Sequence, residues 1–372
     1  MTGSVSTMTG PLITGWSAVS PYGIGREAFE EGFRSGRSTT VPLAGEDWLG
    51  EDRADTEACL VPGFVIKEVL GKKGTRAMDR VTGLVVTTVG KLLDTTGGPL
   101  PSEVTDADTA LVLGTTHGSA KSMVDITRDT LTDEKPYYIN TAHIPNAIGN
   151  ASAGMCAIWY GLKGPNTTLA AGRCSGLYAL NYGRRLLAAG RAKTVLCGAA
   201  EEYTTDRSWL EWHSRGADEA GTVLGEGCAM VSLRAASADG RGDDDALAEV
   251  VGVTAGVVGP DGVAASLETV VGNALRRAGI SRDQLWAVSA SAPAGEAGRA
   301  EMKALDALFG DLDLLTLGRP GLIGDTSAAT SAFQLVATLT AAQDSARAAG
   351  RVAVITSVDR DGALGCALLR LR

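Results

Sequence analysis

Histidine is scarce in this chain. The 372 residues include only three, His117, His143 and His213. Because histidine is the side chain that most readily exchanges a proton near neutral pH, any imidazole general base must be one of these three. Their settings favour structural or surface roles: His117 follows a predicted strand, His143 precedes Ile144-Pro145-Asn146, and His213 lies in a tryptophan-rich helical segment.

Paired cysteines are absent, since the six in the chain are scattered and no two form a CxxC motif. This spacing argues against a disulfide framework and against an ordinary zinc site. Five of them lie among apolar or small residues and are expected to be buried: Cys59, Cys156, Cys197, Cys228 and Cys366. Only Cys174 lies at a bend where chemistry is expected.

The chain also lacks a basic excess and a long apolar run. Its net charge is −9, which argues against nucleic acid as a partner. No run is long enough to span a bilayer, and the start MTGSVSTMTG has no charged and apolar leader pattern. We therefore expect a cytoplasmic protein with no membrane partner and, in the absence of any recognisable motif, no cofactor and no metal.

What is present is an internal repeat. The tetrapeptide AAGR stands at 188–191 and again at 348–351, each time between a predicted helix and a strand rich in valine. A predicted helix leads to a strand at 79–113, and the same order returns at 267–289. The opening strands PLITGWSAVS and LAEVVGVTAG are also alike. Self-similarity of this size indicates a duplicated α/β unit.

The pattern predicts an α/β fold built from two similar halves. The helices at 177–189 and 329–340 are small or apolar nearly all round, as in helices buried between layers. The strands are short continuous apolar runs, typical of sheets covered on both faces. We predict two mixed sheets sandwiching buried helices, with an N-terminal half at 1–245 and a C-terminal half at 246–372. The hinge is placed in the glycine-rich stretch AASADGRGDDD, residues 235–245.

The segment 164–201 carries the strongest functional signal. A β-prone run, Thr167–Leu169, enters the small-residue turn Ala170-Ala171-Gly172, and a helix is predicted from Ser175. A strand that bends sharply into a helix N-terminus is a common place for a nucleophile, because the helix dipole favours negative charge there. At this bend the chain has Arg173 followed by Cys174.

Several segments in one order resemble the thiolase-fold β-ketoacyl-ACP synthases, over nearly the whole chain. They are LITGWSAVSPYGIG, GTRAMDRVTGLVVTTVGKLLDTTG, IPNAIGNASAGMCAIWYGLKGPNTT and GEGCAMVSLR. The resemblance implies a thiolase-like fold. It also implies a catalytic cysteine at the elbow and two histidines in the second half, which stabilise the enolate formed when malonyl loses CO₂.

Residue by residue, the resemblance places altered residues at each of these positions. The family's cysteine falls on Arg173 and its two histidines fall on Ala290 and Asp325. The threonines of its first histidine loop fall on Ala292 and Ala294, and its C-terminal glycine-phenylalanine gate reads Asp359-Arg360-Asp361-Gly362. An arginine stays protonated in proteins and is neither nucleophile nor base, so ordinary condensation chemistry is not expected.

The first interpretation is therefore a non-catalytic partner, resembling the chain-length factor of type II polyketide synthases. Such a subunit pairs with an active ketosynthase, meets the acyl carrier protein and its phosphopantetheine-bound chain mainly through that partner, and walls off the polyketide tunnel. The strand Thr194–Cys197 is expected at the interface. The helix 119–131 is expected beside the tunnel, where Met123, Ile126, Thr127 and Thr130 share one face. Better-known chain-length factors have glutamine at the elbow, so this chain departs from them.

A second interpretation is an acyltransferase-type enzyme that uses Cys174 as a nucleophile shifted by one residue. Arg173 and the helix N-terminus would both lower the pKa of its thiol. Against this, the next residue on a helix is rotated by roughly 100° and faces another direction. A third is a degenerate homodimer with a regulatory role. If the chain is a non-catalytic partner or a degenerate homodimer, Arg173 fills the former catalytic pocket. It then needs an acceptor, since an unpaired buried charge is costly, and we predict Asp325 as that acceptor.

Overall fold

The computed structural model describes residues 10–44, 46, 49, 52–93, 107–237, 243–316 and 321–372. Its main feature is a pair of five-stranded mixed sheets that repeat one strand order. The first half contains β1 (Leu12–Ser20), β5 (Thr109–Gly114), β6 (Asn166–Leu169), β7 (Thr194–Glu201) and β9 (Gly227–Arg234). The second half contains β10 (Ala248–Val257), β11 (Leu285–Ala290), β12 (Asp313–Thr316), β13 (Val352–Val358) and β14 (Ala363–Leu371).

The two strand orders correspond one to one. The first sheet runs β6-β5-β7-β9-β1 and the second runs β12-β11-β13-β14-β10. In each, the first three strands are parallel and the last two pair antiparallel. The sheets meet where β1 and β10 pair through Leu12–Glu249 and Ile13–Ala248. This repetition confirms the duplicated α/β halves.

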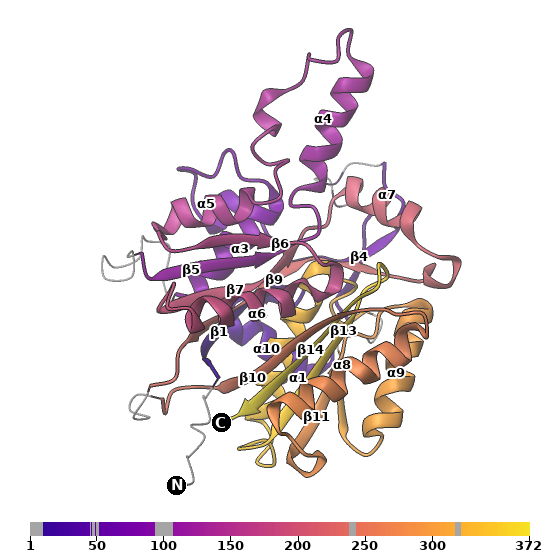
Figure 1. Ribbon diagram of the computed structural model, residues 1–372. Helices are drawn as coiled ribbons and strands as arrows, with labels where there is room; N and C mark the ends of the chain where they lie inside the picture. Colours follow the sequence, from indigo (N-terminus) through magenta and orange to yellow (C-terminus); the bar gives the residue numbers. More distant parts are fainter. Residues whose placement is uncertain are drawn as a thin grey trace.

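The helices form three layers around these sheets (Figure 1). In chain order they are α1 (Arg26–Ser35), α2 (Ile66–Val69), α3 (Arg80–Leu92), α4 (Ala120–Thr132), α5 (Ala151–Tyr160), α6 (Ser175–Ala188), α7 (Thr205–Ser214), α8 (Gly262–Ala278), α9 (Gly295–Phe309) and α10 (Thr330–Gln343). Helices α6 and α10 lie between the sheets and share one apolar core with both. The outer face of the first sheet packs on α3 and α5, and that of the second packs on α8 and α9.

Small residues allow the two central helices to meet closely. A Cβ on Gly176 of α6 would lie 2.5 Å from the backbone nitrogen of Ala332 on α10. The backbone N–H of Leu177 donates to the hydroxyl of Ser331 at 3.2 Å. The small and apolar residues of α6 and α10 predicted helices buried between layers, and both helices pack against the two sheets and against each other.

The remaining strands are short. Strands β3 (Thr40–Pro42), β4 (Glu57–Cys59) and β8 (Leu224–Gly225) make a small sheet, while β2 (Gly23–Ile24) pairs with β1. Helix α4 begins an arm, residues 120–148, that projects beyond the sheets (Figure 1). Among the described helices, none has the length and apolar character needed to cross a bilayer.

One expectation about the sheets was wrong. The strand Thr194–Cys197 was expected at a subunit interface, but it is part of β7, which lies between β5 and β9 and is almost wholly buried. The strand at the edge of this sheet is β6. An apolar run alone does not distinguish an interior strand from an interface strand, since both are covered.

Candidate functional site

The elbow joins β6 to α6 through a 3₁₀ turn, Gly172–Cys174. Gly172 adopts a φ of +50°, a left-handed conformation that favours glycine. A Cβ at this position would also lie 2.0 Å from Oδ1 of Asp359. The positive φ and the nearby carboxylate are thus two independent reasons for glycine at position 172. The turn presents the next residue, Arg173, at the start of a helical segment.

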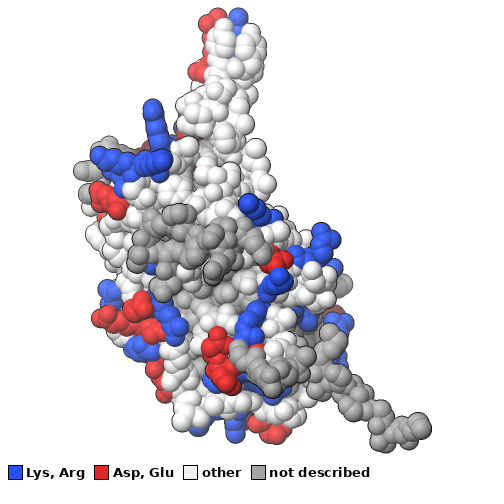
Figure 2. All heavy atoms as spheres, turned by 90° about the vertical axis from the view of Figure 1, so that its left-hand side faces the viewer, with Lys and Arg blue, Asp and Glu red and all other residues white. Residues whose placement is uncertain are grey.

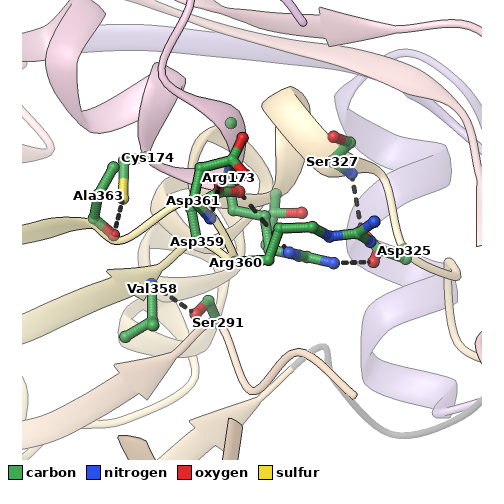
Figure 3. A network of polar contacts seen from close by, with 12 residues as sticks. Arg173, Cys174, Ser291, Asp325, Ser327, Val358, Asp359, Arg360, Asp361 and Ala363 are labelled. Atoms are coloured by element: carbon green, nitrogen blue, oxygen red, sulfur yellow. Dashed lines mark hydrogen bonds and ion pairs between the residues drawn. The ribbon is translucent and has the colours of Figure 1, made fainter. Parts of the chain in front are cut away.

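Arg173 is buried with only 4% of its side chain exposed, and its charge is matched by two carboxylates. Its Nη2 donates to Oδ2 of Asp325, while its Nη1 lies 3.6 Å from Oδ1 of Asp359 (Figure 3). Its backbone N–H donates to the same oxygen of Asp359 at 2.9 Å. The predicted pairing with Asp325 is confirmed, and Asp359 is a second partner that was not predicted.

These contacts hold the cluster in its charged form. Burial by itself would raise the pKa of Asp325, but the charge of Arg173, its hydrogen bond and the backbone N–H of Ser327 lower it to about 2. Burial lowers the pKa of Arg173, whereas Asp325 and Asp359 raise it by more. At neutral pH Arg173 is therefore a guanidinium and Asp325 an ionised carboxylate, and neither readily exchanges a proton.

A cavity of about 280 Å³ lies beside this cluster, and Arg173, Ala290 and Asp325 all line it. The three positions come from the elbow, the end of β11 and the segment before α10. The tertiary structure thus brings together the residues that the resemblance assigned to one centre. Among the described residues, neither a cysteine nor a histidine lines this cavity.

The loop after β11 is anchored by the buried Glu301 of α9. Its carboxylate accepts hydrogen bonds from the backbone N–H of Ala292 (2.7 Å), the hydroxyl of Ser291 (2.7 Å) and the hydroxyl of Thr356 (2.7 Å). Ala292, which has a φ of +42°, also lines the cavity, as does Ala294. Hydrogen bonds to Glu301 thus hold the loop in place. Alanines stand where the family resemblance places the histidine (Ala290, at the end of β11) and the threonines (Ala292 and Ala294, in the loop).

Cys174, the nucleophile of the second interpretation, lies outside this cavity, and its surroundings do not favour a reactive thiol. Its side chain is fully buried, and the backbone oxygens of Ser357 (3.3 Å) and Ala363 (3.4 Å) both lie within hydrogen-bonding distance of its Sγ. Figure 3 shows the thiol directed toward Ala363 and away from the guanidinium of Arg173. Burial raises the pKa of the Cys174 thiol to about 12, despite the nearby Arg173, so the thiolate is disfavoured.

The segment Asp359–Gly362 is tied to two neighbours. Asp359 faces Arg173, while Nη2 of Arg360 lies 3.0 Å from Oε2 of Glu211 on α7. Nη1 of Arg360 also donates to the hydroxyl of Ser214 at 3.1 Å. A signal for Asp359 was present in the sequence, because each AAGR-strand unit ends at an acidic residue, Glu201 in the first half and Asp359 in the second.

The four residues expected beside a tunnel lie on α4. Thr127 and Thr130 are exposed, Met123 is 36% exposed and Ile126 is half-buried. None of the four lines the cavity beside Arg173 or a second, larger cavity described below. Their role as tunnel residues stays a prediction that involves a partner.

The three histidines also lie outside the cavity at Arg173. His143 has Nδ1 3.5 Å from Oδ2 of Asp125, and His213 stacks on Trp209 with ring centroids 5.8 Å apart. His117 is exposed at the end of β5. Within the described parts of the chain, no cluster of His, Cys, Asp and Glu side chains is arranged to hold a metal ion.

Comparison with known proteins agrees with this geometry. The family model "Beta-ketoacyl synthase, N-terminal domain" matches residues 12–238. A 3-oxoacyl-[acyl-carrier-protein] synthase 2 of Synechocystis sp. is 25% identical over 243 residues, which span 60% of this chain and 56% of that protein. The corresponding synthase of Coxiella burnetii is 25% identical over 365 residues, 90% of this chain and 86% of that protein.

Solved structures are similar over nearly the whole chain. The ishigamide ketosynthase/chain length factor has 42% identity and a TM-score of 0.89, with 97% of this chain and 99% of that chain covered. A β-ketoacyl synthase from Burkholderia phymatum STM815 has 19% identity and a TM-score of 0.81, with 98% and 100% covered, which shows the fold. From its thiolase-like fold, its elbow and these matches, we conclude that the chain belongs to the β-ketoacyl synthase family.

Proposed function

We propose that this chain is a non-catalytic chain-length-factor subunit of a type II polyketide synthase. The observation that carries this proposal is Arg173 at the elbow, buried and paired with Asp325 and Asp359. An arginine in this setting keeps its proton and has no lone pair with which to attack a thioester. Its two carboxylate partners make it a stable filling of the site where a nucleophile is expected.

The other two positions point the same way. The methyl group of Ala290 donates no hydrogen bond, and Asp325, whose pKa is lowered to about 2, carries a negative charge. Catalysis of this kind needs hydrogen-bond donors aimed at the developing negative charge. An enolate or an oxyanion that formed next to Asp325 would instead be repelled by its carboxylate. These residues support a subunit without decarboxylase activity of its own.

The exposed apolar side chains support a protein partner. Seven of the fourteen exposed large hydrophobic side chains of the described residues fall between 123 and 158: Met123, Leu131, Tyr137, Tyr138, Ile144, Ile148 and Ile158. Figure 2 shows the arm at the top with charged atoms gathered at its tip and an uncharged flank below. β6 adds a sheet edge with no further strand beside it in the described chain. Exposed apolar surface next to an open sheet edge is typical of an interaction site.

We infer that this partner is an active ketosynthase, and that the acyl carrier protein with its phosphopantetheine-bound chain is met mainly through it. The 42% identity to the ishigamide ketosynthase/chain length factor supports the inference. With only 16% identity, TM-score 0.76, and 98% of this chain and 100% of that chain covered, the complex "AntDE:AntF (apo): type II PKS acyl-carrier protein in complex with its ketosynthase bound to the hexaketide" supports the fold alone. In such a pair, the face of α4 with Met123, Ile126, Thr127 and Thr130 would line the tunnel and set its depth.

Co-expression with the ketosynthase encoded nearest to this chain tests the proposal. We expect a stable heterodimer that decarboxylates malonyl carrier protein, and no decarboxylation by this chain alone. An active homodimer of this chain would overturn the proposal. Stoichiometric acylation of Cys174 by acyl thioesters, read by mass spectrometry, would instead restore the acyltransferase alternative.

A further inference from the structure

The arm, residues 120–148, projects from the body of the protein, and its two ends meet at a pair of glycines (Figure 1). Gly118 precedes α4 and Gly149 precedes α5, and a Cβ on Gly118 would lie 3.2 Å from the Cα of Gly149. Gly118 has a φ of +74°, a left-handed conformation that favours glycine. Because small residues readily absorb changes in backbone angles, this glycine neck is the place where the arm can turn.

The arm is anchored at Ser119, directly after Gly118. Ser119 is 1% exposed and caps α4 by accepting the backbone N–H of Ser122 at 3.3 Å. Together with Asp79 and Glu202 it borders a second cavity, of about 1690 Å³, at the base of the arm. Its hydroxyl faces both carboxyl groups and lowers the pKa of each. A change in the charge of these carboxyls therefore acts on the residue that begins the arm.

The two carboxyl groups join the N-terminus of α3 to the end of β7. Oδ1 of Asp79 accepts the backbone N–H of Thr82 at 2.9 Å, and Oε2 of Glu202 accepts that of Val81 at 3.0 Å. The remaining oxygens, Oδ2 of Asp79 and Oε1 of Glu202, are buried without a hydrogen-bond partner. Buried polar atoms are nearly always paired. Since solvent and ligands do not reach these two oxygens, their partner must come from within the cluster.

One shared proton supplies that partner. Two neighbouring buried carboxyl groups do not both ionise readily, so such a pair retains a proton. Burial, and after it the charge of Asp79, raises the pKa of Glu202 to about 8, and burial also raises the pKa of Asp79. A proton on Oε1 of Glu202 would be donated to Oδ2 of Asp79 and would pair both oxygens. Without it, the single hydroxyl of Ser119 faces two negative charges.

The cations near the pair are engaged with other acceptors. The charged and titratable groups around the pair lie on α3, β7, α7, the turn before β9 and the arm: Arg80, Glu201, Arg207, Glu226, Lys121, Asp125 and His143. Arg80 donates to both oxygens of Glu226 at 2.6 and 2.5 Å. Arg207 donates to backbone oxygens at 2.7–3.0 Å, and Lys121 pairs with Asp125 at 2.7 Å. These surroundings favour a retained proton over a second negative charge.

We propose that Asp79 and Glu202 share one proton and that this proton latches the arm to the body through Ser119. Loss of the proton frees the arm to turn at the neck of Gly118 and Gly149. The arm carries most of the exposed apolar side chains found between positions 123 and 158, so the latch determines how that surface is presented. The inference does not rest on the proposed function, because the pair, the neck and the arm all belong to this chain.

The direction of the pH response follows from the shared proton. In the latched arrangement Glu202 has a pKa of about 8, whereas a carboxyl freed by release has the ordinary pKa of about 4.3. The ratio of released to latched arms should therefore rise by up to about tenfold per pH unit between about pH 5 and 8, and level off above that.

Hydrogen–deuterium exchange of the full chain, purified without a partner, measures this ratio. After correction for the intrinsic exchange rate, both legs of the arm, 118–124 and 144–150, should lose protection together with that slope. They should exchange faster than the buried helix α6, which reports unfolding of the whole protein. Glu202→Gln should keep both legs protected at every pH, because its amide donates a hydrogen that does not titrate.

A second latch variant and two controls complete the test. Asp79→Asn should act like Glu202→Gln, since its amide donates to Glu202 from the other side. Glu268→Gln, on an exposed residue of α8, is the matched control and should leave the slope unchanged. His143→Gln should also leave it unchanged, although His143 lies on the arm with its Nδ1 3.5 Å from Asp125.

Protection of the unaltered chain that does not depend on pH would overturn the proposal. So would a slope that is kept in Glu202→Gln and lost in His143→Gln, because the imidazole would then be the group that responds. Loss of protection confined to 118–124, with 144–150 unchanged, would show fraying of α4 and no turning of the arm. Equal exchange of both legs and α6 would show that the pair stabilises the whole fold and does not control the arm.

Discussion

The backbone N–H of Arg173 donates to the carboxylate of Asp359 across 2.9 Å, although 186 positions separate the two residues. The same carboxylate oxygen lies 3.6 Å from the guanidinium of Arg173, so Asp359 holds both the backbone and the side chain of the elbow residue. Removing either the buried cation or its carboxylate partner leaves the other charge buried without compensation, which is strongly destabilising.

Replacing Arg173 by alanine should therefore destabilise the protein. The change leaves Asp325 and Asp359 as buried carboxylates without their cation, and we expect a loss of about 3–5 kcal/mol in the free energy of unfolding. Urea unfolding followed by circular dichroism measures the loss. Arg347→Ala, which breaks the exposed pair with Asp313, is the control and should cost about 1 kcal/mol or less. Equal effects of the two variants would contradict the role assigned to the buried cluster.

Returning a cysteine to the elbow should not return the chemistry. In Arg173→Cys the thiol would face a cavity that still has Ala290 and an unpaired Asp325, with no histidine to stabilise an enolate. We expect no decarboxylation of malonyl carrier protein above the background of the unaltered chain. Release of CO₂ by this variant, measured with labelled malonyl groups, would show that the missing histidines are dispensable.

Cys174 should be unreactive in the folded protein. With the pKa of its thiol near 12, only about one molecule in 10⁴ carries a thiolate at pH 8. Iodoacetamide should leave Cys174 unmodified in the native chain and label it fully in urea, as read by peptide mass mapping. Rapid native labelling at Cys174 would mean that the thiol has access to solvent.

Stability should fall as the pH rises from mildly acidic to about 8. Because the pKa of Glu202 is raised from its usual value near 4.3 to about 8, the folded state favours the protonated carboxyl. The associated stability is complete below the unfolded pKa and is lost as the pH rises through about 8. The urea midpoint should therefore decline between about pH 5 and 8 and level off above that. In Glu202→Gln the decline should be smaller; an unchanged slope would assign it to other groups.

Gly172→Ala should cost more than an equivalent change elsewhere. Gly190 also has a left-handed φ, +63°, but a Cβ there would meet no atom within 4 Å. Gly190→Ala thus measures backbone strain alone, about 1 kcal/mol. Gly172→Ala adds a clash with Asp359, and we expect a further loss of about 2 kcal/mol or more in thermal or urea unfolding. Equal losses would mean that the Asp359 carboxylate moves aside freely.

Much of the fold and part of the site follow from local sequence. The AAGR repeats and the apolar helices predicted the duplicated halves, because periodicity and turn residues are properties of a few neighbouring residues. The spacing around the elbow placed Arg173, Ala290 and Asp325 at one centre, and all three line one cavity. The requirement that a buried cation be paired predicted the contact of Arg173 with Asp325.

Other features depend on which distant segments meet, and no local pattern encodes that. Only the strand order decided that β6 forms the edge of its sheet while β7 lies inside it. Only the packing of the loop after β13 against the elbow made Asp359 a second partner of Arg173 and turned the Cys174 thiol toward Ala363. The sequence by itself determined the repeat, the elbow and the residue that occupies it. The tertiary structure decided which carboxylates neutralise that residue and which surfaces remain open, because both depend on contacts between residues more than a hundred positions apart.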